Sequence, residues 1–352
     1  MNINTEKLKI LLISPLPPPA GGIATWTKLF INSEQAKKNV VDVVNVAITG
    51  KRINNLAKKN LVDELKRTTS IYLKTRKKLK KKYDIVHINS ACSTLGMVRD
   101  YMCIKMAKNS KSKVVVHFHC DTGYMVKGKF SEFIFRKICN SVDRIFSLNE
   151  SSETHIKLMA NKSSIRIPNF INLKSMDLYQ NNISDEIKSI IYVGHIIKSK
   201  GCMDIFSVAE KMPNLNFKLV GKASEEIKYT SKPKNVQYYG EIPKEEVMNY
   251  MLSADVLLFP TYTEGFPNVI LEAMACGLPI VATPVGAIPE MLEEKGGVLI
   301  EVGNIDGFVN AIKGLQEKKI RKQISRWNKD KVRSKYSLGL VIKQIFSEYS
   351  KI

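Results

Sequence analysis

Short, unbroken apolar runs alternate with longer segments of helical periodicity along most of the chain. In the first half the apolar runs are Lys9–Ser14, Val40–Ala47, Asp84–Asn89, Lys113–Phe118 and Asp143–Leu148. The amphipathic segments between them include Ile23–Gln35, Leu95–Ala107 and Ser131–Asn140. Strands that are apolar at nearly every position are typical of parallel sheets covered by helices on both faces. The first half therefore predicts an α/β domain with a parallel sheet.

The alternation resumes in the second half, after a polar, Asn-rich stretch at 173–187 that suits a linker. The expected strands are Ser189–Val193, Asn216–Val220, Val236–Tyr239, Asp255–Phe259, Pro279–Ala282 and Val298–Ile300. The expected helices are Gly201–Lys211, Lys244–Leu252, Asn268–Cys276 and Asp306–Gln316, followed by a basic amphipathic tail from Lys318 to Ile352. We expect two α/β domains, at 1–172 and 188–330, and a C-terminal helix at 331–352. Ligands of such sheets bind beyond the carboxyl ends of the strands, so we expect chemistry in a cleft between the domains.

Composition narrows the class of protein. The chain has 352 residues, 44% of them hydrophobic and 25% charged, as in soluble globular proteins of about two domains. We see no secretory signal and no run of about 20 apolar residues, and expect a cytoplasmic location, peripheral to the inner face of the cell membrane. The six cysteines show no CxxC spacing and no Cys/His cluster, so we expect buried thiols rather than disulfides or a zinc site.

Charge is distributed very unevenly between the two halves. Residues 1–175 hold 32 Lys+Arg and 12 Asp+Glu, a net +20, whereas residues 176–352 hold 23 and 21, a net +2. Residues 51–82 alone carry 13 Lys+Arg with a broken apolar stripe. Such a run is usually a solvated helix face. The sharper interpretation is contact with anionic lipid head groups, at about 1 kcal/mol per basic residue, and we expect peripheral membrane association through this half.

The most informative segment runs from Asp255 to Pro289. A buried strand ends near Pro260, a loop with Glu264 and Gly265 follows, and a helix begins near Asn268, where Pro267 fits the first turn. The free amides and positive dipole of a helix start make a natural site for a diphosphate. Two carboxylates beside a phosphate site need hydroxyl partners, which favours a sugar for Glu264 and a ribose for Glu272. Spacing alone favours plainer roles, in which Glu264 is a solvated loop residue and Glu272 caps the helix or forms a surface ion pair.

A second strand-to-helix corner in the same half adds a cation. The strand Ile190–Gly194 ends in His195, and Lys200 follows just before the next expected helix. A lysine is a compact point-charge partner for phosphate. Two corners of one domain are then equipped for a diphosphate.

The run E-G-F-P-N-V-I-L-E from Glu264 to Glu272 resembles the E-x7-E motif of the retaining glycosyltransferases of family 4. Ala273-Met274-Ala275, the segment 277–282, V-G-H-I-I-K-S-K-G and the N-terminal loop P-P-P-A-G-G resemble further elements of that family in the same order. The resemblance implies the GT-B architecture, with two facing Rossmann-like domains and a last helix that returns to the first. It implies an acceptor-binding N-terminal domain and a C-terminal domain that binds the nucleotide-sugar.

The resemblance also assigns roles to residues. Glu264 is expected to contact the donor sugar, Glu272 the ribose hydroxyls, and Lys200 the diphosphate. The backbone that follows the first glutamate is expected to meet sugar and phosphate, at Gly265, Phe266, Pro267, Asn268 and Val269. His195 stands where the family usually has arginine. A neutral imidazole is a weaker diphosphate partner than a guanidinium fork.

Two N-terminal residues complete the expected site. Gly22 is expected to let its loop approach the leaving phosphate and the acceptor, although a Gly-Gly pair is often only a turn. His119 resembles the histidine that touches the donor sugar near the reaction centre. His117, two residues earlier, is expected on the opposite face of the strand, and either histidine could be structural.

The resemblance and a missing motif suggest the chemistry. No D-x-D occurs in the chain, so we expect no metal and no other cofactor. Lys200, amides and helix dipoles then stabilise the leaving diphosphate, where one good donor contributes about 3 kcal/mol. The resemblance implies retention of anomeric configuration without a protein nucleophile, a donor that is most commonly a UDP-sugar, and a glycan or lipid-linked acceptor in bacterial capsular, exo- or lipopolysaccharide synthesis.

Other interpretations stay open. An epimerase or phosphorylase of the same architecture would use the same donor site. A catalytically silent sugar-nucleotide binder would bind donor without turnover. The basic half also suggests nucleic-acid binding, but the aromatic-basic interleaving and the recognition motifs of such proteins are missing, so we expect no nucleic-acid partner.

Overall fold

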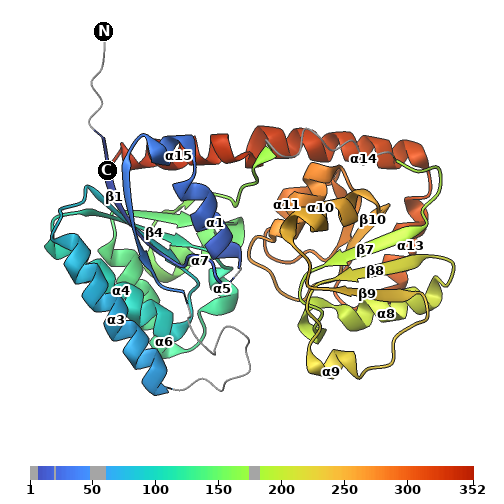
Figure 1. Ribbon diagram of the computed structural model, residues 1–352, viewed down its shortest axis with the longest axis horizontal. Helices are drawn as coiled ribbons and strands as arrows, with labels where there is room; N and C mark the ends of the chain where they lie inside the picture. Colours follow the sequence, from blue (N-terminus) through green and yellow to red (C-terminus); the bar gives the residue numbers. More distant parts are fainter. Residues whose placement is uncertain (1–6, 20, 48–60, 174–182) are drawn as a thin grey trace, which may run out of the picture. The chain divides into compact units, whose positions relative to one another are not determined.

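A computed structural model describes residues 7–19, 21–47, 61–173 and 183–352 of the chain. The chain divides into two compact units, the first made of residues 1–169 and 338–352 and the second of residues 170–337. Each unit contains a six-stranded parallel sheet with helices packed on its faces (Figure 1). The sequence placed the first boundary after 172 and a linker at 173–187, of which 174–182 lie outside the described residues. The helix expected at 331–352 belongs to the first unit from Leu338 onward.

The first unit has the strand order β2-β1-β3-β4-β5-β6. Its strands are β1 (Lys9–Ser14), β2 (Val40–Asn45), β3 (Ile85–Ser90), β4 (Lys113–Phe118), β5 (Arg144–Ser147) and β6 (Ile165–Arg166). Its helices are α1 (Gly22–Ile31), α2 (Glu34–Lys37), α3 (Leu61–Leu79), α4 (Thr94–Asn109), α5 (Thr122–Met125), α6 (Lys129–Ser141), α7 (Glu150–Ala160) and α15 (Leu338–Tyr349). Ile10 of β1 pairs with Val41 on one side and Ile85 on the other, so β1 lies inside the sheet. Helices on both faces explain why residues 10–13 of β1 are all apolar and buried.

The basic run identified in the sequence contains the helix α3. Ile71, Thr75 and Leu79 recur every four residues and are buried, which gives the helix one face toward the core. Residues 51–60 of the same run lie outside the described part of the chain. The helix α7, which the sequence analysis did not delimit, begins after Asn149, whose side chain caps the amide of Ser152.

A buried polar contact attaches α15 to the sheet of the first unit. The hydroxyl of Tyr349 lies 2.5 Å from Nδ1 of His87, which belongs to β3, and both side chains are fully buried. Phe346 of the same helix stacks on Phe30 of α1. Burial lowers the pKa of His87 to about 3, so the imidazole is neutral in this contact.

The second unit has the strand order β12-β11-β10-β7-β8-β9. Its strands are β7 (Ser189–Val193), β8 (Asn216–Val220), β9 (Val236–Gly240), β10 (Val256–Phe259), β11 (Ile280–Ala282) and β12 (Gly297–Leu299). Its helices are α8 (Cys202–Lys211), α9 (Glu225–Lys228), α10 (Lys244–Leu252), α11 (Asn268–Cys276), α12 (Ile288–Leu292), α13 (Ile305–Gly314) and α14 (Lys318–Lys331), and a π-helical turn follows at Val332–Tyr336. The strands β7 and β10 are neighbours in the middle of this sheet, so the loops after them meet at one edge.

Two features bear on the setting of the protein. Among the residues described, no helix combines the length and the apolar character needed to cross a bilayer. All six cysteines have free thiols, and five of them are buried.

Candidate functional site

A half-buried ion pair lies where the loops after β7 and β10 meet. Nζ of Lys200 lies 2.6 Å from Oε1 of Glu264 and also donates to the carbonyl of Thr263 at 2.7 Å. The carboxylate is further approached by the hydroxyl of Thr261, a side chain without solvent exposure. The two residues that the sequence assigned to separate corners are therefore direct partners in the second unit.

Burial sets the electrostatics of this pair. It raises the pKa of the Glu264 carboxyl above its ordinary value, although Lys200 and the hydroxyl of Thr261 pull it back. The side chains of Glu264 and Lys200 keep only 16% and 25% of their surface exposed. A charge pair of this kind carries a substantial desolvation cost. An anionic ligand can therefore compete for Lys200 while the carboxylate turns to a hydroxyl.

Close packing of backbone holds the loop that carries Glu264. At Gly286, where φ is +57°, an added Cβ would meet the carbonyl oxygens of Glu264 at 2.3 Å and Gly265 at 2.8 Å. The amide of Ala287 donates to the carbonyl of Gly265. At Gly201, where φ is +75°, an added Cβ would lie 2.0 Å from the carbonyl oxygen of Pro260. Glycine is required at both positions for steric and conformational reasons.

The helix α11 begins beyond this loop. Pro267 precedes its first residue and contributes no amide hydrogen, while Asn268 and Val269 are half-buried in its first turn. Phe266 is buried, and its ring packs edge-on against Tyr336. Its side chain therefore belongs to the core of the second unit, and only its backbone is part of the loop surface. The helix ends at Gly277 in the left-handed conformation.

The remaining candidates of the second unit differ in exposure. Glu272 lies in the second turn of α11 and is half-buried. His195 follows β7 with an exposed side chain, and its carbonyl accepts a hydrogen bond from the hydroxyl of Tyr192 at 2.8 Å. That contact fixes the backbone of the turn and leaves the imidazole at the surface.

The first unit contains Gly22 and His119. Gly22 is the first residue of α1, and His119 follows β4. Trp26 of α1 packs edge-on against the ring of His119, with centroids 5.2 Å apart. The helix that Gly22 begins therefore covers His119.

A chain of hydrogen bonds orients His119. The hydroxyl of Thr27 donates to the carbonyl of Ile23 and lies 2.5 Å from Oγ of Ser14. Nδ2 of Asn89 donates to that Ser14 oxygen at 2.8 Å, which leaves Oδ1 of Asn89 to accept from Nε2 of His119 at 3.0 Å. The chain thus selects the tautomer of His119 that carries its proton on Nε2.

His119 is neutral at physiological pH. Burial, with a further contribution from His87, lowers its pKa to about 3, against a hydrogen bond with Asn169 that raises it. Its role in any chemistry is therefore to form hydrogen bonds or pack as a neutral ring.

The expectation that His117 lies on the opposite face from His119 is wrong. The two rings are 3.9 Å apart between centroids, and both contact Trp26. Residues two apart in a strand point to the same face, which accounts for the pairing. His117 is fully buried and its Nε2 lies 3.3 Å from the carbonyl oxygen of Ile167, as expected of a structural histidine.

Sequence reasoning missed several residues that support these candidates. Thr261 and Gly286 hold the Glu264 loop, and Ser14 and Asn89 orient His119. They come from distant segments, so no local pattern identified them. No group of three or more His, Cys, Asp or Glu side chains suited to a metal ion occurs in the described part of the chain.

Comparison with known proteins relates the part of the chain that contains this site to a family. Residues 177–331 match the family of glycosyl transferases group 1. The N-acetyl-alpha-D-glucosaminyl L-malate synthase of Bacillus anthracis is 25% identical over 76% of this chain and 74% of its own length. The capsular polysaccharide biosynthesis glycosyltransferase CapM of Staphylococcus aureus is 24% identical over 59% of this chain and 58% of its own length.

The chain is a glycosyltransferase whose residues 177–331 match the group 1 family. The fold agrees with this assignment. The crystal structure of Anabaena HepE in complex with UDP has a TM-score of 0.75, with 16% sequence identity, and covers 98% of this chain and 100% of its own. The glycosyltransferase therefore has the GT-B fold that the sequence predicted.

We expect Gly286→Ala to damage the site of this glycosyltransferase. The new methyl group would displace the carbonyls of Glu264 and Gly265, because neither backbone oxygen can move aside freely. Chemical denaturation should show a loss of about 1–3 kcal/mol in the free energy of unfolding. The matched control is Gly314→Ala at the end of α13, where an added Cβ meets nothing within 4 Å. Equal stability of the two variants would contradict the packing described.

Proposed function

We propose that this glycosyltransferase moves a sugar from a nucleoside-diphosphate sugar, most simply a UDP-sugar, to a glycan or lipid-linked acceptor during synthesis of a bacterial surface polysaccharide. The observation that carries the proposal is the half-buried Lys200–Glu264 pair beside the start of α11. A cation, a carboxylate and the positive end of a helix dipole together match a diphosphate and the sugar attached to it.

The donor is proposed to rearrange this pair. The diphosphate takes the ammonium group of Lys200 and the first amides of α11, whose dipole adds favourable potential. Glu264, released from Lys200, accepts a hydrogen bond from a hydroxyl of the donor sugar. Glu272, in the second turn of α11, accepts hydrogen bonds from the ribose hydroxyls.

The departing diphosphate is proposed to be neutralised by protein groups without a metal ion. Lys200 and the amides after Gly265 are donors already held in place by Gly201 and Gly286, so little reorganisation is needed as negative charge develops. His119 contributes a neutral ring of fixed tautomer in the first unit. Transfer with retention of anomeric configuration follows from the resemblance to family 4 and needs no protein nucleophile.

The relatives support the substrate class. One of them is named for capsular polysaccharide biosynthesis, and the structurally similar HepE was crystallised in complex with UDP and with UDP-glucose. Exposed His195 in place of the family's arginine leaves Lys200 as the main cation at this corner, which fits a donor of modest affinity.

Donor binding is tested by calorimetry with UDP, GDP, ADP and the matching nucleotide-sugars, with magnesium or EDTA. We expect one nucleoside diphosphate to bind equally well with either addition. Glu272→Ala should weaken it about tenfold or more, because a charge-assisted contact to the ribose is lost. Glu290→Ala, on α12 of the same unit, is the control. Absence of binding by every nucleotide would contradict the proposal.

We further propose that the first unit docks on anionic membranes through α3, α4 and α6. These helices lie side by side in Figure 1, with α4 between the other two. They expose large apolar side chains, among them Leu65 (68% exposed) and Leu73 (56%) on α3, and Phe130 (59%) and Phe133 (52%) on α6. Exposed lysines accompany them at positions 66, 74, 77, 129 and 137. Apolar groups among cations suit a surface of anionic lipid.

Vesicle sedimentation tests this surface. We expect the protein to bind phosphatidylglycerol vesicles better than phosphatidylcholine vesicles, and less at high salt. Phe130→Ser with Phe133→Ser should weaken binding at least about tenfold, because two aromatic rings lose their apolar contact. The control is Leu158→Ser, which removes a side chain 78% exposed on α7 of the same unit. A double variant that still sediments like the wild type would refute the proposed surface.

A further inference from the structure

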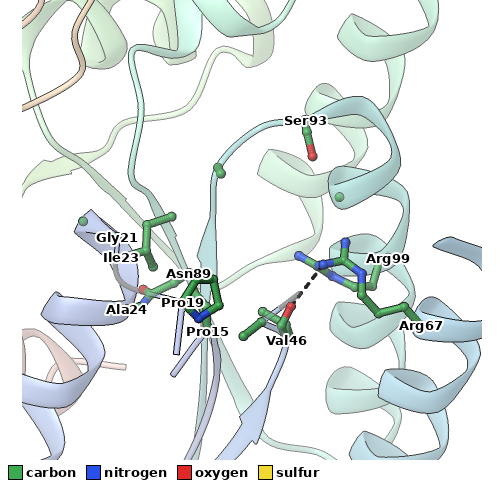
Figure 2. Close-up of a pocket in the computed structure, with 14 residues that line it drawn as sticks. Pro15, Pro19, Gly21, Ile23, Ala24, Val46, Arg67, Asn89, Ser93 and Arg99 are labelled. Atoms are coloured by element: carbon green, nitrogen blue, oxygen red, sulfur yellow. Dashed lines mark hydrogen bonds between the residues drawn. The ribbon is translucent and has the colours of Figure 1, made fainter. Parts of the chain in front are cut away.

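A pocket of about 390 Å³ opens at the carboxyl ends of β1, β2 and β3 in the first unit. Figure 2 shows it between the start of α1, the ends of these strands and the helices α3 and α4. Its volume lies in the range of small-molecule sites. Most of its wall is apolar or glycine, and its ionisable side chains among the described residues are Arg67 and Arg99.

Arg99 is placed in an unusual position for a charged residue. It keeps only 8% of its surface exposed, although it lies in the second turn of α4. Nε and Nη2 both donate to Oδ1 of Asp100, at 3.0 and 2.7 Å. Nη1 has no hydrogen-bond partner among the described residues, and the side chain lines the pocket. This nitrogen is open to the pocket and can donate to an acceptor from outside the protein.

Arg67, which belongs to α3, lines the same pocket. Its Nη1 donates to the carbonyl of Val46 at 3.3 Å, and its Nη2 pairs with Glu64. Its Nε is buried and has no partner. Figure 2 shows the guanidinium groups of Arg67 and Arg99 pointing toward one another. The open Nη1 of Arg99 and the guanidinium of Arg67 thus border one space.

The backbone around the arginines keeps this space open. At Gly96 an added Cβ would lie 2.5 Å from Oγ of Ser93 and 3.9 Å from Nη2 of Arg99. The first residues of α1 and α4 also border the pocket, and their free amides favour an anion. Glu64 and Asp100 each balance the charge of one arginine, so an anion would be held by the N–H donors that these carboxylates leave unused.

We propose that this pocket binds the acceptor through an anionic group, a phosphate or a carboxylate, held by the guanidinium groups of Arg67 and Arg99. The fork of a guanidinium matches the paired oxygens of either group, which explains two converging arginines better than a neutral hydroxyl does. The inference rests on the proposed function, since it names the acceptor of the same reaction. Asn89, which orients His119, also lines the pocket, so the bound acceptor lies next to that network.

The experiment measures binding of glucose 1-phosphate, glucuronate and glucose by calorimetry, with and without saturating UDP. One variant is Arg67→Gln, whose partner Glu64 remains partly solvated. The second is Arg99→Met with Asp100→Leu, which replaces the buried pair by apolar groups and avoids an unpaired charge. The control is Arg136→Gln, which removes a guanidinium whose side chain is 52% exposed on α6.

We expect an anionic sugar to bind more tightly than glucose, and each pocket variant to weaken that binding at least about tenfold. The control should bind like the wild type. Preference for glucose 1-phosphate indicates a phosphorylated acceptor, and preference for glucuronate an acidic sugar. Equal binding of glucose, or anion binding that survives both pocket variants, overturns the inference.

UDP binding separates this inference from the proposed function. Pocket variants that keep wild-type affinity for UDP are folded and retain the donor site, so their loss of anion binding is specific. A wild-type protein that binds the anionic sugar but no nucleotide would refute the donor proposal and leave the pocket assignment intact.

Discussion

The second unit is organised around the ion pair of Lys200 and Glu264. Its two members lie 64 residues apart in the chain and meet because β7 and β10 are neighbours in the sheet. Gly201 and Gly286 permit backbone contacts that other residues would prevent, and these contacts bring the two loops together. The pair occupies a place of low solvent exposure, where charge interactions are strong and costly. A cation and a carboxylate paired in such a place suit a ligand that separates them.

The first unit uses burial in a different way. His87, His117 and His119 lie together against Trp26, and burial lowers the pKa of each. Neutral imidazoles can be held in an apolar environment at small cost when their protons have partners. Tyr349 supplies such a partner for His87, and Asn89 for His119. The cluster thereby joins α15, α1 and the sheet, and ends at the wall of the arginine pocket.

Much of the fold could be predicted from the sequence because the strands are buried on both faces. Lys9–Ser14 and Asn216–Val220 are strands with the predicted bounds, since an uninterrupted apolar run followed by a turn leaves few alternatives. The same reasoning predicted that Glu264 and Lys200 lie at strand-to-helix corners of one domain, because the carboxyl ends of parallel strands lie at one edge of the sheet. Their direct pairing could not be predicted, since it depends on which strands are neighbours.

The parts that escaped prediction depend on contacts between distant residues. The error over His117 came from ignoring the two-residue period of a strand, which the ring contact with His119 makes plain. Arg67 and Arg99 line one pocket from two helices, and one of these helices lies in a run that the sequence shows only as basic. Gly286 has no local signal, because its importance comes from a carbonyl 22 residues away in the chain.

The most direct test of the account is the affinity for UDP of Lys200→Met compared with Lys211→Met, measured by calorimetry. Lys211 lies on α8 of the same unit and forms an exposed ion pair with Asp306, so it controls for the loss of one charge. The account predicts an affinity at least about tenfold lower for Lys200→Met alone, as expected for loss of a charge-assisted contact to the diphosphate. Equal affinities in the two variants would contradict the central role of the Lys200–Glu264 pair in donor binding.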